Sequence, residues 1–192
     1  MTPREVRFTT SPALSAELAP RAKGRTTTGP VLHGYAAVFN TLSTNLGGFF
    51  ERVQRGAFAE SLKRDVRALF NHNSASLLGR TRSGSLKVFE DQHGLAFELR
   101  LPDTQLGHDI RELVSRGDVS QMSFGFSVPD GGDTWTYEAG RTIRVLRKVE
   151  LWEISLVVDP AYSSTSVMLR EMIAGLADML AARRLRVADL LR

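Results

Sequence analysis

The sequence of 192 residues contains no cysteine. This absence excludes a disulfide framework, a thiolate nucleophile and any metal site with cysteine ligands. No stretch approaches the roughly 18 apolar residues that a membrane span needs, and the first twenty residues lack the apolar run behind a basic leader that a secretory signal requires. We therefore expect an intracellular protein that works without a metal and without a membrane.

The chain also lacks a large excess of charge of one sign. It has 25 Lys and Arg residues against 21 Asp and Glu residues, a net charge of +4 at pH 7. The basic residues near the end (Arg183, Arg184, Arg186 and Arg192) follow a predicted helix, whose dipole they complement. Aromatic residues are 8% of the chain and fall mostly on apolar strand faces, where they offer no stacking platform to a nucleic acid. Nucleic-acid binding is not expected.

The length fits one folded domain with two extensions. Residues 1–30 are rich in Thr, Ser, Pro, Ala and Gly and show no hydrophobic period, so they predict a flexible N-terminal arm. Residues 31–170 form the predicted domain. Residues 171–192 predict a C-terminal amphipathic helix and tail, because apolar residues recur there at helical spacing. Such an apolar stripe is typical of core packing or of a contact between subunits.

Apolar and polar residues alternate in much of the domain, which predicts short strands. A hairpin is predicted over residues 85–101, and two helices are predicted over residues 56–65 and 104–117. Further strands are predicted at 31–39, 66–70, 119–128, 134–137, 142–149 and 151–158. Many short strands and few helices favour an α+β, mainly β fold, an antiparallel β-barrel flanked by helices.

The direction of side chains in two strands selects candidate residues. Successive residues of a strand point to opposite faces. In residues 119–128 the even positions are large and apolar, so Ser123 points away from the core and Ser120 toward it. In residues 151–158, Glu153 lies on the face opposite Trp152. Ser123 and Glu153 are therefore the better candidates for chemistry.

Two other carboxylates compete with Glu153. Glu150 falls on the predicted Trp152 face, which makes it a poor candidate. Asp159 keeps the parity of Glu153 but lies at the strand end, so it is the second choice for the acid.

A hydroxyl, an imidazole and a carboxylate are the parts that nucleophilic catalysis requires. Ser123, His72 and Glu153 can supply them. Structural roles are equally compatible with the spacing: Ser123 as a small residue for close packing, Glu153 as an ion-pair partner of an arginine such as Arg80 or Arg147, and His72 as a cap of the turn that follows residues 66–70. Spacing alone leaves both readings open.

Several segments, in order, resemble the prohead (head maturation) serine proteases of tailed bacteriophages. The resemblance runs from about residue 33 to 170 and is carried by residues 34–39, 51–62, 69–73, 78–80, 117–126, 153–157 and 160–162. It implies a fold similar to the herpesvirus assemblins. It also implies that His72, Ser123 and Glu153 are catalytic. Ile154 stands where the family commonly has valine.

The resemblance implies a serine endopeptidase that cleaves the scaffolding segment of the major capsid protein, or a scaffold protein, and its own termini. It would act as a homo-oligomer in the bacterial cytoplasm, inside the assembling prohead. The alternative is a non-catalytic capsid assembly or scaffold protein with a degenerate protease fold. The other histidines lack ligand spacing and no phosphate-binding glycine loop occurs, so neither a metal nor a cofactor is indicated.

Overall fold

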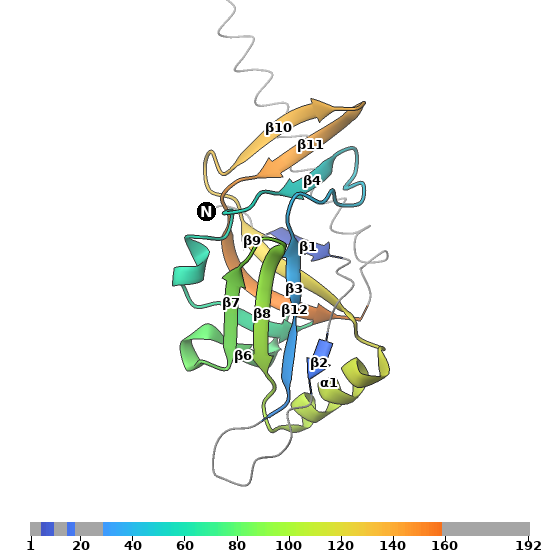
Figure 1. The fold of residues 1–192 in the computed structure, drawn as a ribbon, viewed down its shortest axis with the longest axis vertical. Helices are drawn as coiled ribbons and strands as arrows, with labels where there is room; N and C mark the ends of the chain where they lie inside the picture. Colours follow the sequence, from blue (N-terminus) through green and yellow to red (C-terminus); the bar gives the residue numbers. More distant parts are fainter. Residues whose placement is uncertain (1–4, 10–14, 18–28, 159–192) are drawn as a thin grey trace, which may run out of the picture.

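The computed structural model describes residues 5–9, 15–17 and 29–158. Strands dominate these ranges, and the strands form three sheets (Figure 1). The predicted C-terminal helix and tail, residues 171–192, lie outside the described residues. No helix in the described part of the chain is long and apolar enough to cross a membrane.

The five-stranded sheet carries the predicted site residues. Its order is β1-β9-β12-β5-β6. The strands are β1 (Glu5–Thr9), β9 (Gln121–Ser127), β12 (Glu150–Val157), β5 (Arg67–Phe70) and β6 (Asn73–Arg80). All neighbours are antiparallel except β12 and β5, which run parallel.

Two smaller sheets complete the fold. The four-stranded sheet, in the order β2-β3-β8-β7, contains β2 (Ser15–Glu17), β3 (Val31–Val38), β8 (Gly94–Arg100) and β7 (Leu86–Glu90). The three-stranded sheet contains β10 (Asp133–Glu138), β11 (Arg141–Leu146) and β4 (Phe50–Val53), and its β10–β11 hairpin projects at the top of Figure 1. β11 and β4 are parallel.

The core lies between the five-stranded and four-stranded sheets. Strand β3 contacts β9, and β6 contacts β8. The alternate apolar residues of β9 and β12 join those of β3 and β8 in one buried cluster. The predicted mainly β fold is confirmed, but a closed barrel is not found among the described strands. The pairs β12–β5 and β11–β4 are parallel, so the sheets are not purely antiparallel as predicted. The two strands of each pair lie far apart in the chain, as parallel neighbours must, because a tight turn cannot join them.

The local predictions with strong signals are confirmed. The hairpin over residues 85–101 forms β7 and β8. Helix α1 (Gln105–Arg116) begins after Thr104, whose side chain accepts a hydrogen bond from the backbone N–H of Gly107. It ends at Gly117, which has the left-handed conformation (φ 80°) that favours glycine.

Three local predictions differ from the structure. The predicted helix over residues 56–65 is a series of turns followed by the 3₁₀ helix η1 (Ser61–Lys63), in which Ser61 is buried. A second 3₁₀ helix, η2 (Thr81–Ser83), follows β6. β6 itself begins where a polar turn was predicted. Strands β1 and β2 lie within the predicted N-terminal arm.

Candidate active site

The turn between β5 and β6 positions His72. Phe70 pairs with Asn73, and the two residues between them, Asn71 and His72, both have positive φ angles (50° and 58°). This is the backbone that a two-residue hairpin of type I′ requires. Asn71 is held to the end of β12 and to the residue that follows it: its N–H donates to the carbonyl of Leu156 (2.9 Å), and its side-chain oxygen accepts from the N–H of Val158 (3.2 Å). The tight turn therefore fixes His72 against β12.

His72 and Glu153 are brought together. Nδ1 of His72 lies 2.7 Å from Oε1 of Glu153. The carboxylate is fully buried, whereas the imidazole retains 19% of its side-chain exposure. A buried carboxylate requires hydrogen bonds to offset its loss of hydration. The His72 ring supplies one of them, and a serine on the same strand supplies another.

That serine is Ser155, which the sequence reasoning did not single out. Its hydroxyl donates to Oε2 of Glu153 (2.6 Å) and accepts from the backbone N–H of His72 (3.3 Å). Ser155 has no exposed surface. The sequence did hold one signal for Ser155: it lies two residues after Glu153 in the same strand, so both side chains point to the same face.

Ser123 lies on the neighbouring strand, directly across from Ser155. Their Cα atoms are partners in the β9–β12 ladder, and Gly125 is the partner of Glu153. Directly opposed residues present their side chains on the same face, with Cβ atoms about 5 Å apart. The structure thus gathers Ser123, Ser155, Glu153 and His72 on one face. Ser123 has no exposed surface.

A β-bulge corrects part of the parity prediction. The register of β12 shifts between Leu151 and Glu153, which makes Trp152 the extra residue. Trp152 is 39% exposed and donates to the hydroxyl of Ser127, so it does not belong to the apolar face as predicted. Glu150 is the partner of Ser127 and therefore shares the Glu153 face. The predicted reason for rejecting Glu150 is wrong.

Glu150 nevertheless has other partners. Its carboxylate accepts from Arg64 (3.1 Å) and from the Ser127 hydroxyl (3.4 Å). Ser120 precedes β9 and is exposed. Asp159, the second choice for the acid, lies outside the described residues.

An ion pair with an arginine was the structural alternative to a catalytic role for Glu153. Arg80, one suggested partner of Glu153, makes its ion pair with Asp65. This pair lowers the pKa of the Asp65 carboxyl, mainly through the hydrogen bond from the guanidinium. The carboxylate of Glu153 instead faces the His72 ring.

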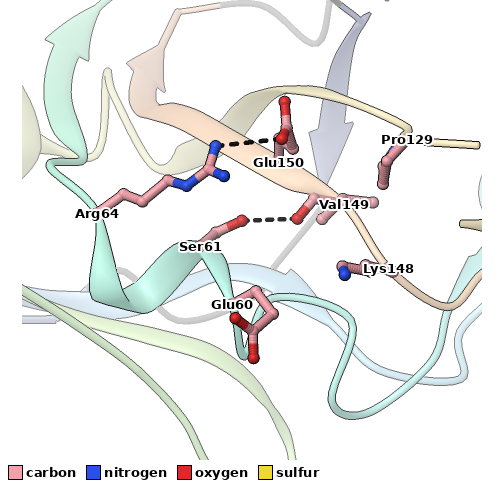
Figure 2. A pocket seen from close by; sticks show the side chains of 7 residues that line it. All are labelled: Glu60, Ser61, Arg64, Pro129, Lys148, Val149 and Glu150. Atoms are coloured by element: carbon pink, nitrogen blue, oxygen red, sulfur yellow. Dashed lines mark hydrogen bonds and ion pairs between the residues drawn. The ribbon is translucent and has the colours of Figure 1, made fainter.

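A separate cavity lies at the beginning of β12 (Figure 2). It contains none of the three predicted site residues. Two contacts join residues that line it. Arg64 forms an ion pair with Glu150, and the Ser61 hydroxyl donates to the carbonyl of Val149. The remaining lining residues are Glu60, Pro129 and Lys148. Four of the seven lining residues are thus engaged in contacts with one another.

Comparisons with known proteins agree with the resemblance of the sequence. The family model described as caudovirus prohead serine protease matches residues 16–177. No curated protein gives a significant match. The solved structure of the bacteriophage T4 capsid assembly protease is similar in fold, with a TM-score of 0.57 and 9% sequence identity over 82% of this chain and 98% of that chain. Since the family model covers most of its length, the chain belongs to the caudovirus prohead serine protease family.

Proposed function

We propose that this chain is a serine endopeptidase of prohead maturation in which Ser123, His72 and Glu153 perform the reaction. The observation that carries the proposal is the 2.7 Å contact between His72 Nδ1 and the buried carboxylate of Glu153, on the sheet face that also holds Ser123. Membership of the prohead protease family supports the same chemistry.

The contact between Glu153 and His72 determines the useful form of the imidazole. An ionised carboxylate only accepts hydrogen bonds, so Nδ1 of His72 carries the proton. A neutral ring then has its lone pair on Nε2, where it can accept the proton of a serine hydroxyl. Glu153 also stabilises the positive charge that develops when the ring is protonated.

The reaction follows from these roles. The Ser123 oxygen attacks the carbonyl carbon of a peptide bond while His72 accepts the hydroxyl proton. His72 returns this proton to the leaving amine, and an acyl-enzyme ester on Ser123 remains. A water molecule, deprotonated by His72, then hydrolyses the ester and releases the new carboxyl terminus.

We infer the substrates from the family. They are the scaffolding segment of the major capsid protein, or a separate scaffold protein, and the termini of the protease itself. The protease would act as a homo-oligomer within the assembling prohead. No cofactor or metal takes part in the proposed reaction.

A serine-reactive fluorophosphonate probe tests the proposal. The probe is added to the chain expressed with its capsid protein, and the labelled residue is identified by peptide mass spectrometry. We expect label on Ser123, loss of label in Ser123→Ala and strong reduction in His72→Ala. Ser120→Ala is the matched control, because Ser120 is an exposed serine outside β9 and its loss should leave labelling unchanged. Absence of label on Ser123 while particles assemble would favour a non-catalytic assembly protein.

A further inference from the structure

A tryptophan side chain lies beside the proposed site, on the same face of the five-stranded sheet. The odd-numbered residues of β9 point to one face, so Ser127 shares the face of Ser123. The indole N–H of Trp152 donates to the Ser127 hydroxyl (3.1 Å). Although Trp152 belongs to β12, its indole therefore lies at the end of β9 on the face that holds Ser123.

The β-bulge in β12 directs this side chain. Trp152 is the extra residue between Leu151 and Glu153, where the register with β9 shifts. Bulges next to active sites commonly re-aim a side chain. Regular alternation would place position 152 on the face opposite Glu153, which packs on the core. The bulge thus brings an aromatic ring to the site face and leaves Glu153 in contact with His72.

Hydrogen bonds hold the indole in one orientation. The Ser127 hydroxyl that accepts from Trp152 donates in turn to Glu150 (3.4 Å), and Ser127 is only 2% exposed. Glu150 is itself paired with Arg64 (3.1 Å), as Figure 2 shows. An aromatic ring that is already oriented loses little conformational entropy when a ligand packs against it. Trp152 is therefore preorganised for contact.

The ring is also open to a partner. Trp152 is 39% exposed, whereas the other large apolar side chains of its strand and of β9 are buried (Met122, Phe124, Phe126, Leu151, Ile154, Leu156 and Val157). Removal of exposed apolar surface from water favours binding. The Arg64–Glu150 pair borders the ring, and a charged border around an apolar contact is typical of binding surfaces.

The separation from Ser123 matches a few residues of an extended peptide. Ser127 follows Ser123 by four residues on one strand, which corresponds to about 13 Å at the usual rise of a strand. Extended peptides that follow a strand have nearly the same rise. When the scissile carbonyl lies at Ser123, a side chain about three to five residues away therefore reaches the indole of Trp152.

We propose that Trp152 is a specificity-determining residue: its indole forms one wall of a substrate subsite for a large apolar side chain, about three to five residues from the peptide bond that is cut. This inference rests on the proposed function, since Ser123 defines the point of cleavage. The ring contacts the bound peptide and takes no part in breaking the bond.

Fluorine NMR tests the contact without cleavage. The Ser123→Ala chain is labelled with 5-fluorotryptophan, which gives one resonance for each of the two tryptophans, Trp135 and Trp152. The probes are overlapping 15-residue peptides that cover the co-expressed capsid protein. We expect the peptide that contains the cut site to shift the Trp152 resonance. Trp135 is the matched control, because it is 40% exposed on β10 of the three-stranded sheet and should not shift.

Cleavage of peptide variants gives a second readout. Peptides that span the cut site carry either leucine or alanine at each position three to five residues from it. We expect the wild-type chain to prefer leucine at one position by about tenfold in kcat/KM. Trp152→Ala should lose this preference, and Trp152→Phe should keep most of it. Trp135→Ala should keep the whole preference, and a thermal melt checks that each variant is folded.

Failure of the contact and failure of the protease function give different results. A shift of the Trp152 resonance, with no protein cleaved by the Ser123 chain, would support the peptide contact and refute only the protease function. Cleaved peptides that leave this resonance unmoved would overturn the subsite and leave the protease function intact. The same holds for a leucine preference that is absent in the wild type or persists in Trp152→Ala. A complete lack of shifts with all peptides would also overturn the subsite.

Discussion

At the scale of single residues, Ser155 links the parts of the proposed site. Its hydroxyl donates a hydrogen bond to Oε2 of Glu153 and accepts one from the backbone N–H of His72. A catalytic carboxylate must be held in one orientation to keep the imidazole in place. In the proposed mechanism Ser155 is therefore a positioning residue, because it contacts Glu153 and the turn that holds His72.

Ser155→Ala should lower kcat about tenfold and leave KM close to that of the wild type, because binding does not depend on Glu153 orientation. Ser155→Thr keeps the hydroxyl and should restore most of the loss. Steady-state cleavage of a fluorogenic peptide from a mapped cut site measures both constants. Equal losses in the two variants would indicate a packing role, and unchanged kcat in Ser155→Ala would reject the positioning role.

Glu153→Gln tests the charge of the proposed acid. The amide has almost the same size as the carboxylate, but it is neutral and can present an N–H to His72, which favours the wrong tautomer. We expect a loss in kcat of at least about a hundredfold. The same peptide assay measures the loss, and a thermal melt checks that the variant is folded. A folded Glu153→Gln chain with wild-type kcat would contradict the assigned role.

At the scale of elements, η1 is joined to β12 by one buried hydroxyl. Ser61 donates to the carbonyl of Val149 (2.6 Å) and accepts from the N–H of Leu151 (2.9 Å). Ser61→Ala leaves both backbone groups without this partner, so the free energy of unfolding should fall by about 1–3 kcal/mol. Urea unfolding measures the change. Ser115→Ala, on the exposed face of α1, is the control and should change stability by less than about 0.5 kcal/mol.

The turn of the β7–β8 hairpin predicts a dependence of stability on pH. The hydroxyl of Tyr35 donates to Asp91 (2.7 Å), and backbone N–H groups of His93 and Gly94 donate to the same carboxylate. The Tyr35 hydrogen bond is the main cause that lowers the pKa of Asp91. A lowered pKa means that this stabilisation is present above the ordinary aspartate value of about 3.9 and is lost as the pH falls through the folded-state value.

Tyr35→Phe should therefore reduce the urea midpoint at neutral pH, and its difference from the wild type should shrink as the pH falls below the ordinary aspartate pKa of about 3.9. Tyr137→Phe is the control, because Tyr137 is 76% exposed. A difference that stays constant over the whole pH range would show that Asp91 ionisation is not involved.

Elements with strong local signals were the predictable part of the fold. The β7–β8 hairpin has alternating residues around a turn, and α1 has its cap at Thr104 and its stop at Gly117. β6 was missed because its first half is polar and exposed, which hides the alternation that a half-buried strand shows. Parallel pairing of β12 with β5 could not be predicted, since it joins segments that are distant in the chain.

The site was predictable to a similar degree. Alternation in β9 selected Ser123, and alternation in β12 selected Glu153. The bulge at Trp152 has no clear sequence signal, so the parity of Glu150 was wrong. The approach of His72 to Glu153 depends on the positive φ angles of a two-residue turn, which the sequence indicated only as a polar segment. The role of Ser155 appears only when the three strands are placed side by side.

At the scale of the whole molecule, the five-stranded sheet carries the proposed site and the three-stranded sheet contacts one edge of it. The five-stranded sheet holds the proposed catalytic residues on one face and packs its other face on the core. The three-stranded sheet contributes Arg144, which binds the N-terminal strand at the edge beside Ser123. The ion pair between Arg144 and Glu5 therefore joins the three-stranded sheet to the edge strand of the five-stranded sheet.

The most direct test of the proposed protease function is the intact mass of the proteins after co-expression with the capsid protein of the same phage or prophage. We expect that the wild-type chain shortens the capsid protein, a scaffold protein or itself, and that Ser123→Ala leaves every chain whole. Whole chains in both cases, with capsid-like particles still formed, would contradict the protease function and assign this fold to assembly alone.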